Sequence, residues 1–348
     1  MTIFDKRIWR NEEIINKIIV LFFCISLASV AHSQTQIKIA TLAPQNSDWA
    51  NRFNDGSKEI FELTEGRVKL KFYWGGAQGG AKKNKQKIKI GQLQGGTFSP
   101  NDFQANFPDL NIYGLPFLFK NLDEVDHVRN LVDDELTAGF KKLGFNTYGF
   151  ASGGFAYIMS NEPIKGYDDL KDKKIWLPQG DLISYRAMKA LDLLPISLPI
   201  TDVLTGLQTG LIDIVAIPPV VALALQWHTK VKYVTKIPVL YVMGFLAIDS
   251  RVIKRLRPDD EALLSEVLTG IYDDVDQMSE KDTENAMQAL LNIGLIEVAF
   301  DENEYNKLTD LLIEPNREMA DNGMFSTELY DKIFMYINNY RKSASITN

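Results

Sequence analysis

The stretch Asp169-Leu170-Lys171-Asp172-Lys173-Lys174-Ile175-Trp176-Leu177-Pro178 has the form of a charged turn that leads into a short apolar strand. The strand is predicted to stop at Pro178, because proline cannot donate a hydrogen bond to a neighbouring strand. A helix is expected at 181–191, and another strand follows at 195–198. Strands that alternate with helices are typical of a parallel sheet in an α/β fold.

The same alternation extends in both directions from this stretch. The chain is expected to open β-α-β-α-β, and further strands are expected at 146–150, 155–160 and 212–217. Two helices are predicted next to an apolar knot at 115–119. Thr201 is expected to cap a later helix that ends at Gly210. The predicted opening strands are 37–41, 68–74 and 95–99, and the opening helices are 49–64 and a lysine-rich helix that ends near residue 92; the two helices near the knot are 122–131 and 134–143.

A long periodic helix is predicted to begin at Pro258 and to continue to about Leu291, before Gly294. At 1.5 Å per residue it would be roughly 50 Å long, which exceeds the width of a small domain. Such a helix would lie across both α/β units. The remaining tail, to about Tyr340, is expected to be helical.

Residues 1–33 are predicted to form a signal peptide. A basic start precedes an apolar run at 18–31, which is short for a membrane span of about 20 residues. Cleavage is expected near Ser33 or Ala31, and an uncleaved anchor is the alternative. The only cysteine, Cys24, lies in this run, so the mature chain would have no disulfide. We expect an exported protein of a bacterial periplasm.

Composition and motifs argue against several classes of protein. The net charge of -7 argues against a nucleic-acid-binding protein. His127 and His228 lie in no metal-binding motif, and the sequence contains no Gly-x-Ser-x-Gly elbow. Asp213 is the one carboxylate with apolar neighbours, and we expect it to cap the entry of its strand or to bond a neighbouring loop. No enzyme activity and no cofactor are predicted.

Four stretches resemble the substrate-binding proteins of TRAP transporters, the DctP-type receptors. They are the first strand and its loop, the Leu-Pro-Phe-x-Phe knot, the pair Ser160-Asn161-Glu162-Pro163-Ile164 and Asp168 to Ile175, and Leu207-Gln208-Thr209-Gly210-Leu211-Ile212-Asp213. The resemblance implies a two-lobed periplasmic binding protein fold of the α/β class, with crossover strands and a long helix that spans both lobes. It also implies delivery of a small-molecule ligand to TRAP membrane permease subunits.

The resemblance further suggests how the chain divides between the lobes. Lobe I is expected to comprise 36–152 and about 243–285, and lobe II 153–242 and about 286–340. The ligand is expected to bind between them.

The departures from the family pattern concern the positions that usually hold a ligand carboxylate. Trp176 stands where relatives have an arginine, Ala156 and Ile217 replace two polar contacts, and Ile200 replaces an aromatic residue. A carboxylate buried there without a cation would cost several kcal/mol or more. An apolar ligand would instead gain about 25 cal/mol for each Å² buried.

The sequence therefore predicts an apolar cleft for a hydrophobic or amphipathic molecule, such as a lipid, a fatty acid or a quinone-like compound. Some of these side chains would point into a lobe core instead, because neighbours on a strand alternate between its faces. The candidate ligand-binding residues are Trp176, Ala156, Ile217, Ile200, Phe155, Tyr157, Trp49 and Arg186.

Two alternatives remain open at this point. An organic-acid receptor would need Arg52 or Arg186 to replace the lost arginine, and Arg186 is the better candidate because it follows the Trp176 strand. A docking protein without transport function is the other. Some members of the resembled family work with a tetratricopeptide lipoprotein, which is a possible further partner.

Overall fold

The computed structural model describes residues 34–45 and 47–347. The predicted signal peptide, its cleavage sites and Cys24 lie outside this range. Among the described helices, none combines the length and apolar character that crossing a membrane requires.

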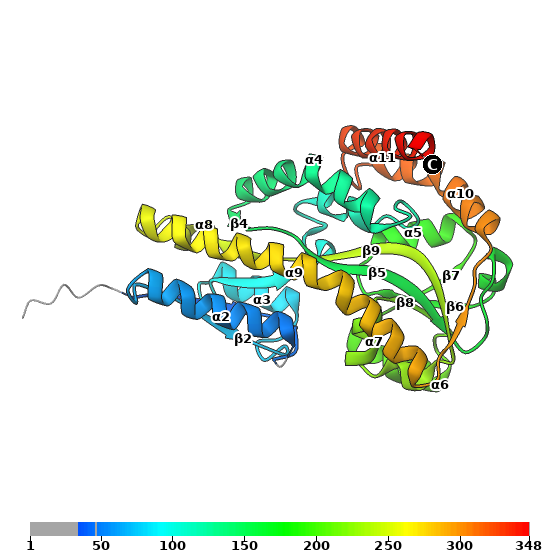
Figure 1. The fold of residues 1–348 in the computed structure, drawn as a ribbon, viewed down its shortest axis with the longest axis horizontal. Coiled ribbons are helices and arrows are strands. Elements are labelled where there is room, and N and C mark those ends of the chain that lie inside the picture. The colour runs from blue at the N-terminus through cyan, green and yellow to red at the C-terminus, as the bar shows by residue number, and fades with distance from the viewer. Residues whose placement is uncertain (1–33, 46, 348) are drawn as a thin grey trace, which may run out of the picture.

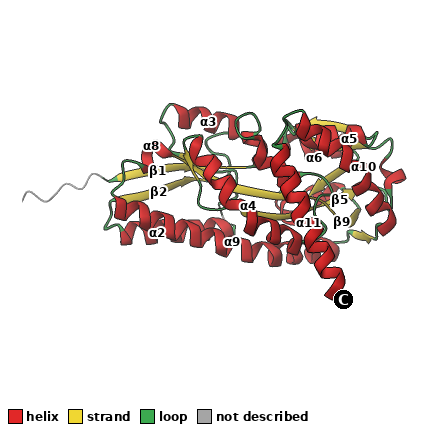
Figure 2. Cartoon of the chain, turned by 90° about the horizontal axis from the view of Figure 1, so that it is seen from above, coloured by secondary structure: helices red, strands yellow, loops and turns green. Residues whose placement is uncertain are grey.

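The strands form one sheet with the order β2-β1-β3-β9-β5-β8-β6-β7, and β4 and β10 pair with β9 beside this path. Helices cover both faces of the sheet. Figure 2 shows α2 and α9 along one face of the strands and α3 and α5 along the other. The strands are β1 (Thr35–Ala40), β2 (Val68–Tyr73), β3 (Gly95–Phe98), β4 (Phe145–Asn146), β5 (Ala151–Ser160), β6 (Lys174–Pro178), β7 (Leu194–Leu198), β8 (Ile214–Ile217), β9 (Tyr233–Asp249) and β10 (Ile296–Val298). The helices are α2 (Asp48–Leu63), α3 (Ala81–Lys89), α4 (Leu122–Lys142), α5 (Leu182–Ala190), α6 (Val203–Thr209), α7 (Pro219–Ala224), α8 (Ser250–Ile253), α9 (Pro258–Asn292), α10 (Glu302–Asp321) and α11 (Thr327–Thr347).

The molecule has two lobes, as Figure 1 shows. In lobe I, β1 pairs in parallel with β2 and β3. In lobe II, β6 pairs in parallel with β7 and β8. The two-lobed α/β fold expected from the sequence is confirmed. The proposed residue boundaries of the lobes stay a prediction.

Strands β5 and β9 cross from one lobe to the other and pair antiparallel along most of their length. Strand β9 is long enough to pair with β3 in lobe I and, at its other end, with β10 in lobe II. The register of β5 shifts between Ser152 and Gly154, and Gly154 has a φ of +77°. The glycine therefore permits a bulge in β5 where the chain passes between the lobes.

Helix α9 has the predicted start and length, and it spans both lobes. Pro258 stands in its first turn, where the missing N–H costs nothing. Its first half packs on α2 in lobe I, and its second half packs on α7 in lobe II. Its apolar residues thus join two separate cores. Leu264, Leu268 and Ile271 belong to the lobe I core, and Met287 and Leu290 belong to the lobe II core.

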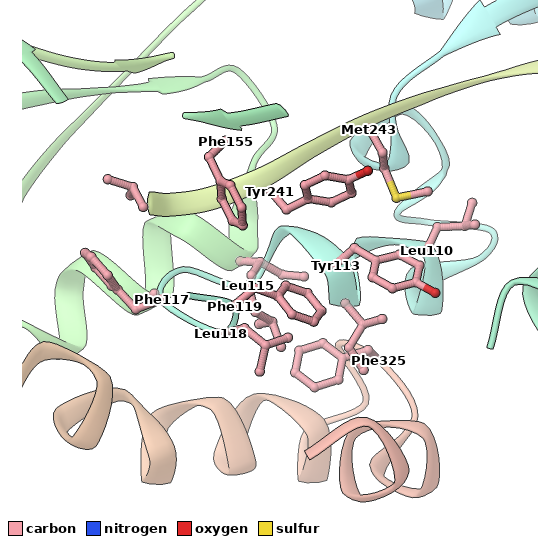
Figure 3. Close-up of a cluster of buried hydrophobic side chains, with 14 of the residues drawn as sticks. Leu110, Tyr113, Leu115, Phe117, Leu118, Phe119, Phe155, Tyr241, Met243 and Phe325 are labelled. Atoms are coloured by element: carbon pink, nitrogen blue, oxygen red, sulfur yellow. The ribbon is translucent and has the colours of Figure 1, made fainter. Parts of the chain in front are cut away.

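The predicted apolar knot at residues 115–119 lies in the largest core cluster. Figure 3 shows Leu115, Phe117 and Phe119 beneath Tyr241 of β9. Phe117 donates its backbone N–H to the carbonyl of Val239 at 2.7 Å. The knot therefore anchors the loop before α4 to the crossing strand.

Three local predictions were wrong. Residues 122–142 form one helix, α4, because Val125, Val128, Val132, Leu136 and Phe140 form one continuous buried stripe. Thr201 does not cap α6, since its hydroxyl bonds the carboxylate of Asp202 within a 3₁₀ turn. The strand expected at 146–150 is reduced to the short β4.

Candidate functional site between the lobes

The strand registers direct the carboxyl ends of both sets of parallel strands toward each other. Along β3, Gly95 pairs with Ile248 and Phe98 with Phe245, so β3 runs toward the middle of β9. Along β8, Ile214 pairs with Ser160 and Ile217 with Tyr157, so β8 runs toward the start of β5. Ligands of open α/β sheets bind outside the carboxyl ends of the strands. The candidate site is therefore the region between these ends.

We call this region the interlobe site and define it by six loops. They follow β1, β2 and β3 in lobe I and β6, β7 and β8 in lobe II. Their described residues are 41–45 and 47–49, 74–80, 99–101, 179–181, 199–202 and 218–220, which include the first residues of α2 and α7 and parts of two 3₁₀ turns.

The first two loops of lobe I are held together by backbone hydrogen bonds. Gly75 N–H donates to the carbonyl of Ala43, and Gly76 N–H donates to that of Thr41, both at 2.9 Å. Both glycines have positive φ, at 60° and 74°, a conformation that other residues rarely adopt. The turn brings the chain against the side chain of Leu42, since a Cβ on Gly76 would lie 3.3 Å from it. Leu42 is consequently fixed in place while 55% of it stays exposed.

An aromatic series borders the lobe I loops. The rings of Trp49 and Phe53 are 4.6 Å apart, and Phe72 and Trp74 stack at 5.0 Å. Phe53 also contacts Phe72 edge to face. Trp49 and Trp74 are partly exposed, so lobe I offers aromatic surface at the interlobe site.

Exposed apolar side chains lie in the loops that follow β7 and β8, and directly after the loop that follows β6. Leu182 follows β6, Ile200 follows β7, and Val220 follows β8. Their exposed fractions are 55%, 43% and 40%. Apolar side chains that gather on an exposed surface often mark a binding site.

Trp176 is packed inside lobe II. Only 2% of it is exposed, and its ring meets that of Trp227 edge to face at 5.1 Å. Its indole N–H donates to the carbonyl of Leu198 at 3.0 Å. The position that the resemblance assigns to an arginine is thus filled by a side chain whose polar atom is already bonded.

The structure brings some of the predicted site residues together and separates others. Ile217 belongs to the same buried cluster as Trp176, and half-buried Tyr157 packs against that cluster. Burial raises the pKa of the Tyr157 hydroxyl. Ala156 is buried on β5, where it pairs with Leu240.

Phe155 points to the opposite face of the sheet from Trp176. Its ring contacts Tyr241 at 5.8 Å, in the core cluster that Figure 3 shows. Phe155 therefore points into a core instead of a cleft, as the alternation of strand neighbours between the two faces of a sheet allows. Of the predicted residues, Trp49 and Ile200 belong to the six loops of the interlobe site, and both keep exposed surface there.

The surroundings of Arg52 and Arg186 do not indicate that either arginine binds a ligand carboxylate. Arg52 forms an ion pair of 2.5 Å with Asp274 of α9. Arg186 is exposed on α5. The six loops contain no lysine or arginine in sequence, whereas they contain Asp48, Asp181 and Asp202.

The carboxylate of Asp181 connects the two lobes. It accepts a hydrogen bond from the N–H of Ser184 at 3.0 Å and so caps α5. The side chain of Asn101, in lobe I, also bonds it. Burial raises the pKa of Asp181, although these hydrogen bonds oppose the shift. Among the described residues, no group of three or more histidine, cysteine, aspartate or glutamate side chains could hold a metal ion.

Sequence reasoning missed Leu42, Leu182 and Val220. Each stands within four residues of the end of a strand, so the predicted strand ends indicated where to expect these residues. The candidate residues that were chosen from family positions within strands have side chains that are mostly buried. Asp213 was correctly assigned a local role, because its carboxylate accepts the N–H of Lys174 at 2.9 Å.

Comparison with known proteins shows the family of this chain. The model of the DctP family, described as bacterial extracellular solute-binding protein, family 7, matches residues 39–321. The uncharacterized protein YiiZ of Salmonella typhimurium strain LT2 is 24% identical over 195 residues. That match covers 54% of this chain and 58% of YiiZ, so it spans less than two thirds of the relative's length.

Solved structures share the fold at low sequence identity. A TRAP periplasmic solute binding protein from Ochrobactrum anthropi, with its C-terminus bound in the ligand binding pocket, superposes with a TM-score of 0.80. It is 18% identical, and the match covers 90% of this chain and 97% of that chain. The sugar acid binding protein DctPAm from Advenella mimigardefordensis, in complex with galactonate, gives a TM-score of 0.80 at 17% identity, over 88% and 99% of the chains.

Proposed function

Because the chain belongs to the DctP family of bacterial extracellular solute-binding proteins, we propose that it is the extracytoplasmic solute receptor of a TRAP-type transporter whose ligand is hydrophobic or amphipathic. The observation that carries the proposal is the composition of the interlobe site. Exposed apolar side chains follow the strands of both lobes, whereas the six loops contain no cationic residue.

The packing of Trp176 supports an apolar ligand. An arginine at this position would present a fork of donors to a carboxylate. The buried indole presents carbon atoms, since Leu198 occupies its only donor. A dry site without a cation disfavours a carboxylate by several kcal/mol, and apolar contact favours an alkyl or ring system by about 25 cal/mol for each Å² buried.

An organic-acid receptor is the second candidate function. The Advenella protein with the same fold binds galactonate, and this favours a sugar acid on the basis of fold alone. A carboxylate would then require Arg186, or Arg52 after loss of its pair with Asp274. Arg186→Ala would abolish ligand-induced thermal stabilisation under this alternative and leave it intact under the first.

The remaining parts of the proposal follow from the family. The chain would be exported by its N-terminal signal peptide, with cleavage near Ser33 or Ala31, and would act in the periplasm. It would bind its ligand reversibly, without chemical change or cofactor, and deliver it to the TRAP permease subunits. A tetratricopeptide lipoprotein is a further candidate partner.

The bound molecule itself provides the test. The exported protein would be purified without detergent and studied by native mass spectrometry, followed by organic extraction and mass analysis of the extract. We expect an additional mass that passes into the organic phase. A protein that carries no such mass and binds short sugar acids or dicarboxylates tightly would contradict the proposal.

A further inference from the structure

The lysines of lobe I gather where no carboxylate neutralises them. Residues 66–101 contain Arg67, seven lysines and no acidic residue, although the whole chain carries a net charge of -7. Arg67 pairs with Glu65 and Asp260. In the part of the chain that the structure describes, the lysines that pair with a carboxylate all lie outside this stretch: Lys58, Lys171, Lys173, Lys174, Lys307 and Lys332. The positive charges of the stretch are therefore left to solvent or to a partner.

Part of this charge lies on one face of the lobe I sheet. Alternate residues of β1 and β2 are buried in the core cluster that these strands share with α2 and α9. The lysines between them point to the opposite face, because strand neighbours alternate between faces. These lysines are Lys38 on β1 and Lys69 and Lys71 on β2.

Helix α3 adds four lysines on the same side of the sheet. It packs on β3, and Figure 2 shows it on the face opposite α2. Lys87 donates to the carbonyl of Gln78 at 3.0 Å, and a Cβ on Gly79 would lie 2.8 Å from the side chain of Lys83. Both contacts are with the loop that continues β2, so the lysines of the helix and of the strands adjoin. We call this set the lysine face; it comprises Lys38, Lys69, Lys71, Lys82, Lys83, Lys87 and Lys89.

The lysine face lowers the stability of lobe I. Lys38 and Lys71 are in register on neighbouring strands, where like charges repel each other. Lys83 and Lys87 stand four residues apart on α3, and like charges at this spacing also destabilise a helix. The first turn of α3 contains Lys82 and no acidic residue, although positive charge there opposes the helix dipole. Negative charge from a partner would offset all three costs.

An exposed apolar side chain and the choice of lysine indicate what kind of partner fits. Ile90 follows Lys89 at the end of α3 and is 67% exposed, more than any other large apolar side chain that the structure describes. The planar fork of an arginine selects a single carboxylate or phosphate, whereas a lysine acts as a compact point charge. Lysines around an exposed apolar side chain suit the headgroup layer of an anionic membrane.

We propose that the lysine face docks on an anionic phospholipid bilayer, with its ammonium groups at the headgroups and Ile90 between them. The loop that leads into α3, residues 74–80, belongs to the interlobe site. Docking would therefore hold one border of that site near the membrane, where a permease could accept the ligand. The inference goes beyond the proposed function, because it requires an extracytoplasmic location but no particular ligand.

Vesicles of two compositions test the charge dependence. The exported protein would be sedimented with vesicles of phosphatidylcholine alone, or of phosphatidylcholine with about 30% phosphatidylglycerol. We expect binding to the anionic vesicles only. This binding should be lost as the salt concentration rises to about 0.5 M, because salt screens exposed charges.

Substitutions tie the binding to this surface. The combined variant Lys82→Gln, Lys83→Gln and Lys89→Gln should bind the anionic vesicles about a hundredfold more weakly, since each lysine near an anionic membrane contributes about fivefold. Ile90→Ser should weaken binding about threefold, because less apolar surface leaves water on docking. These side chains are exposed, so the melting temperature should stay close to that of the wild type.

A matched variant in lobe II separates the lysine face from net charge. Lys189→Gln, Lys232→Gln and Lys236→Gln remove the same charge from exposed positions of α5 and β9 and of the residue before β9. This variant should bind the anionic vesicles nearly as well as the wild type.

The outcomes separate this inference from the proposed function. Equal binding to both kinds of vesicle, or equal losses in the two triple variants, would overturn the docking surface. If neither vesicle binds, the lysines serve another partner, such as an acidic protein surface, and the lipid inference is wrong. An unchanged affinity of Ile90→Ser would remove that side chain from the contact. The mass of the bound ligand is measured without vesicles, so either idea can fail while the other stands.

Discussion

The contact between α4 and α9 contains an arginine that is mostly buried, whereas the interior of lobe II has Trp176, at the position to which the resemblance assigns an arginine. Arg129 of α4 pairs with Asp133 at 3.0 Å and with Asp276 of α9 at 2.6 Å. It also donates to the carbonyl of Phe150, just before β5. Trp176 has carbon neighbours and a single hydrogen bond to a backbone carbonyl.

The guanidinium of Arg129 is surrounded by two carboxylates and the hydroxyl of Tyr241. Burial alone would lower the pKa of Arg129, but Tyr241, Asp133 and Asp276 raise it. Asp276 in turn accepts the N–H of Ser152 on β5 at 2.6 Å. A guanidinium is therefore desolvated at this place, where it connects α9, the helix that spans the lobes, to the crossing strand β5. At position 176, inside lobe II, the chain avoids that desolvation.

The largest expected effect is loss of the buried arginine. Arg129→Met would leave Asp133 and Asp276 without their cation, and breaking a buried ion pair costs about 3–5 kcal/mol. The free energy of unfolding from urea denaturation measures this loss. Arg317→Met is the matched control, because its side chain is 42% exposed and that of Arg129 only 12%; its cost should stay below about 1 kcal/mol. If both variants lost similar amounts of unfolding free energy, the expected difference between a buried and an exposed arginine would be contradicted.

The second prediction concerns the opposite substitution, in which an arginine replaces the buried tryptophan at position 176. Trp176→Arg would place a charge among apolar side chains and remove the contact with Trp227, at a cost of about 3 kcal/mol without ligand. Galactonate should restore part of the lost melting temperature, since its carboxylate would pair with the new cation. Trp176→Phe, which loses only the bond to Leu198 and some volume, should cost about 1–2 kcal/mol and gain nothing from galactonate. A Trp176→Arg protein with unchanged stability would show that the buried indole contributes little.

The smallest expected effect on stability concerns the ion pair between a third arginine, Arg251, and Asp249. Burial alone would raise the pKa of Asp249, but hydrogen bonds from exposed Arg251 lower it below its usual value. A lowered folded pKa stabilises the protein above the unfolded pKa of about 4, and this stabilisation is lost as the pH falls through the folded value. Asp249→Asn keeps the cap on α8 and should cost less than about 1 kcal/mol at pH 7.

The difference between wild type and Asp249→Asn should disappear at about pH 2, where both side chains are neutral. Urea denaturation at a series of pH values measures it. A difference that stays constant across this range would mean that the charge of Asp249 makes no contribution.

Much of the fold was readable from local patterns. The α/β class was predicted from the alternation of strands and helices and from the glycines after helices. The long helix was predicted from the unbroken periodicity that begins at Pro258. These signals depend only on neighbours in sequence. The motif around Trp176 gave the family, and the composition of the six loops was already present in the sequence.

Other features depended on contacts between distant segments. The full extent of β9 followed from pairing with both lobes, and α4 continued without a break because its apolar stripe met a common core. Whether Trp176 faces a ligand or Trp227 is likewise set by the packing of lobe II, since a strand periodicity identifies a face but not what covers it. The sequence thus determined the fold and the absence of cations at the strand ends, and tertiary packing alone decided which side chains remain there to meet a ligand.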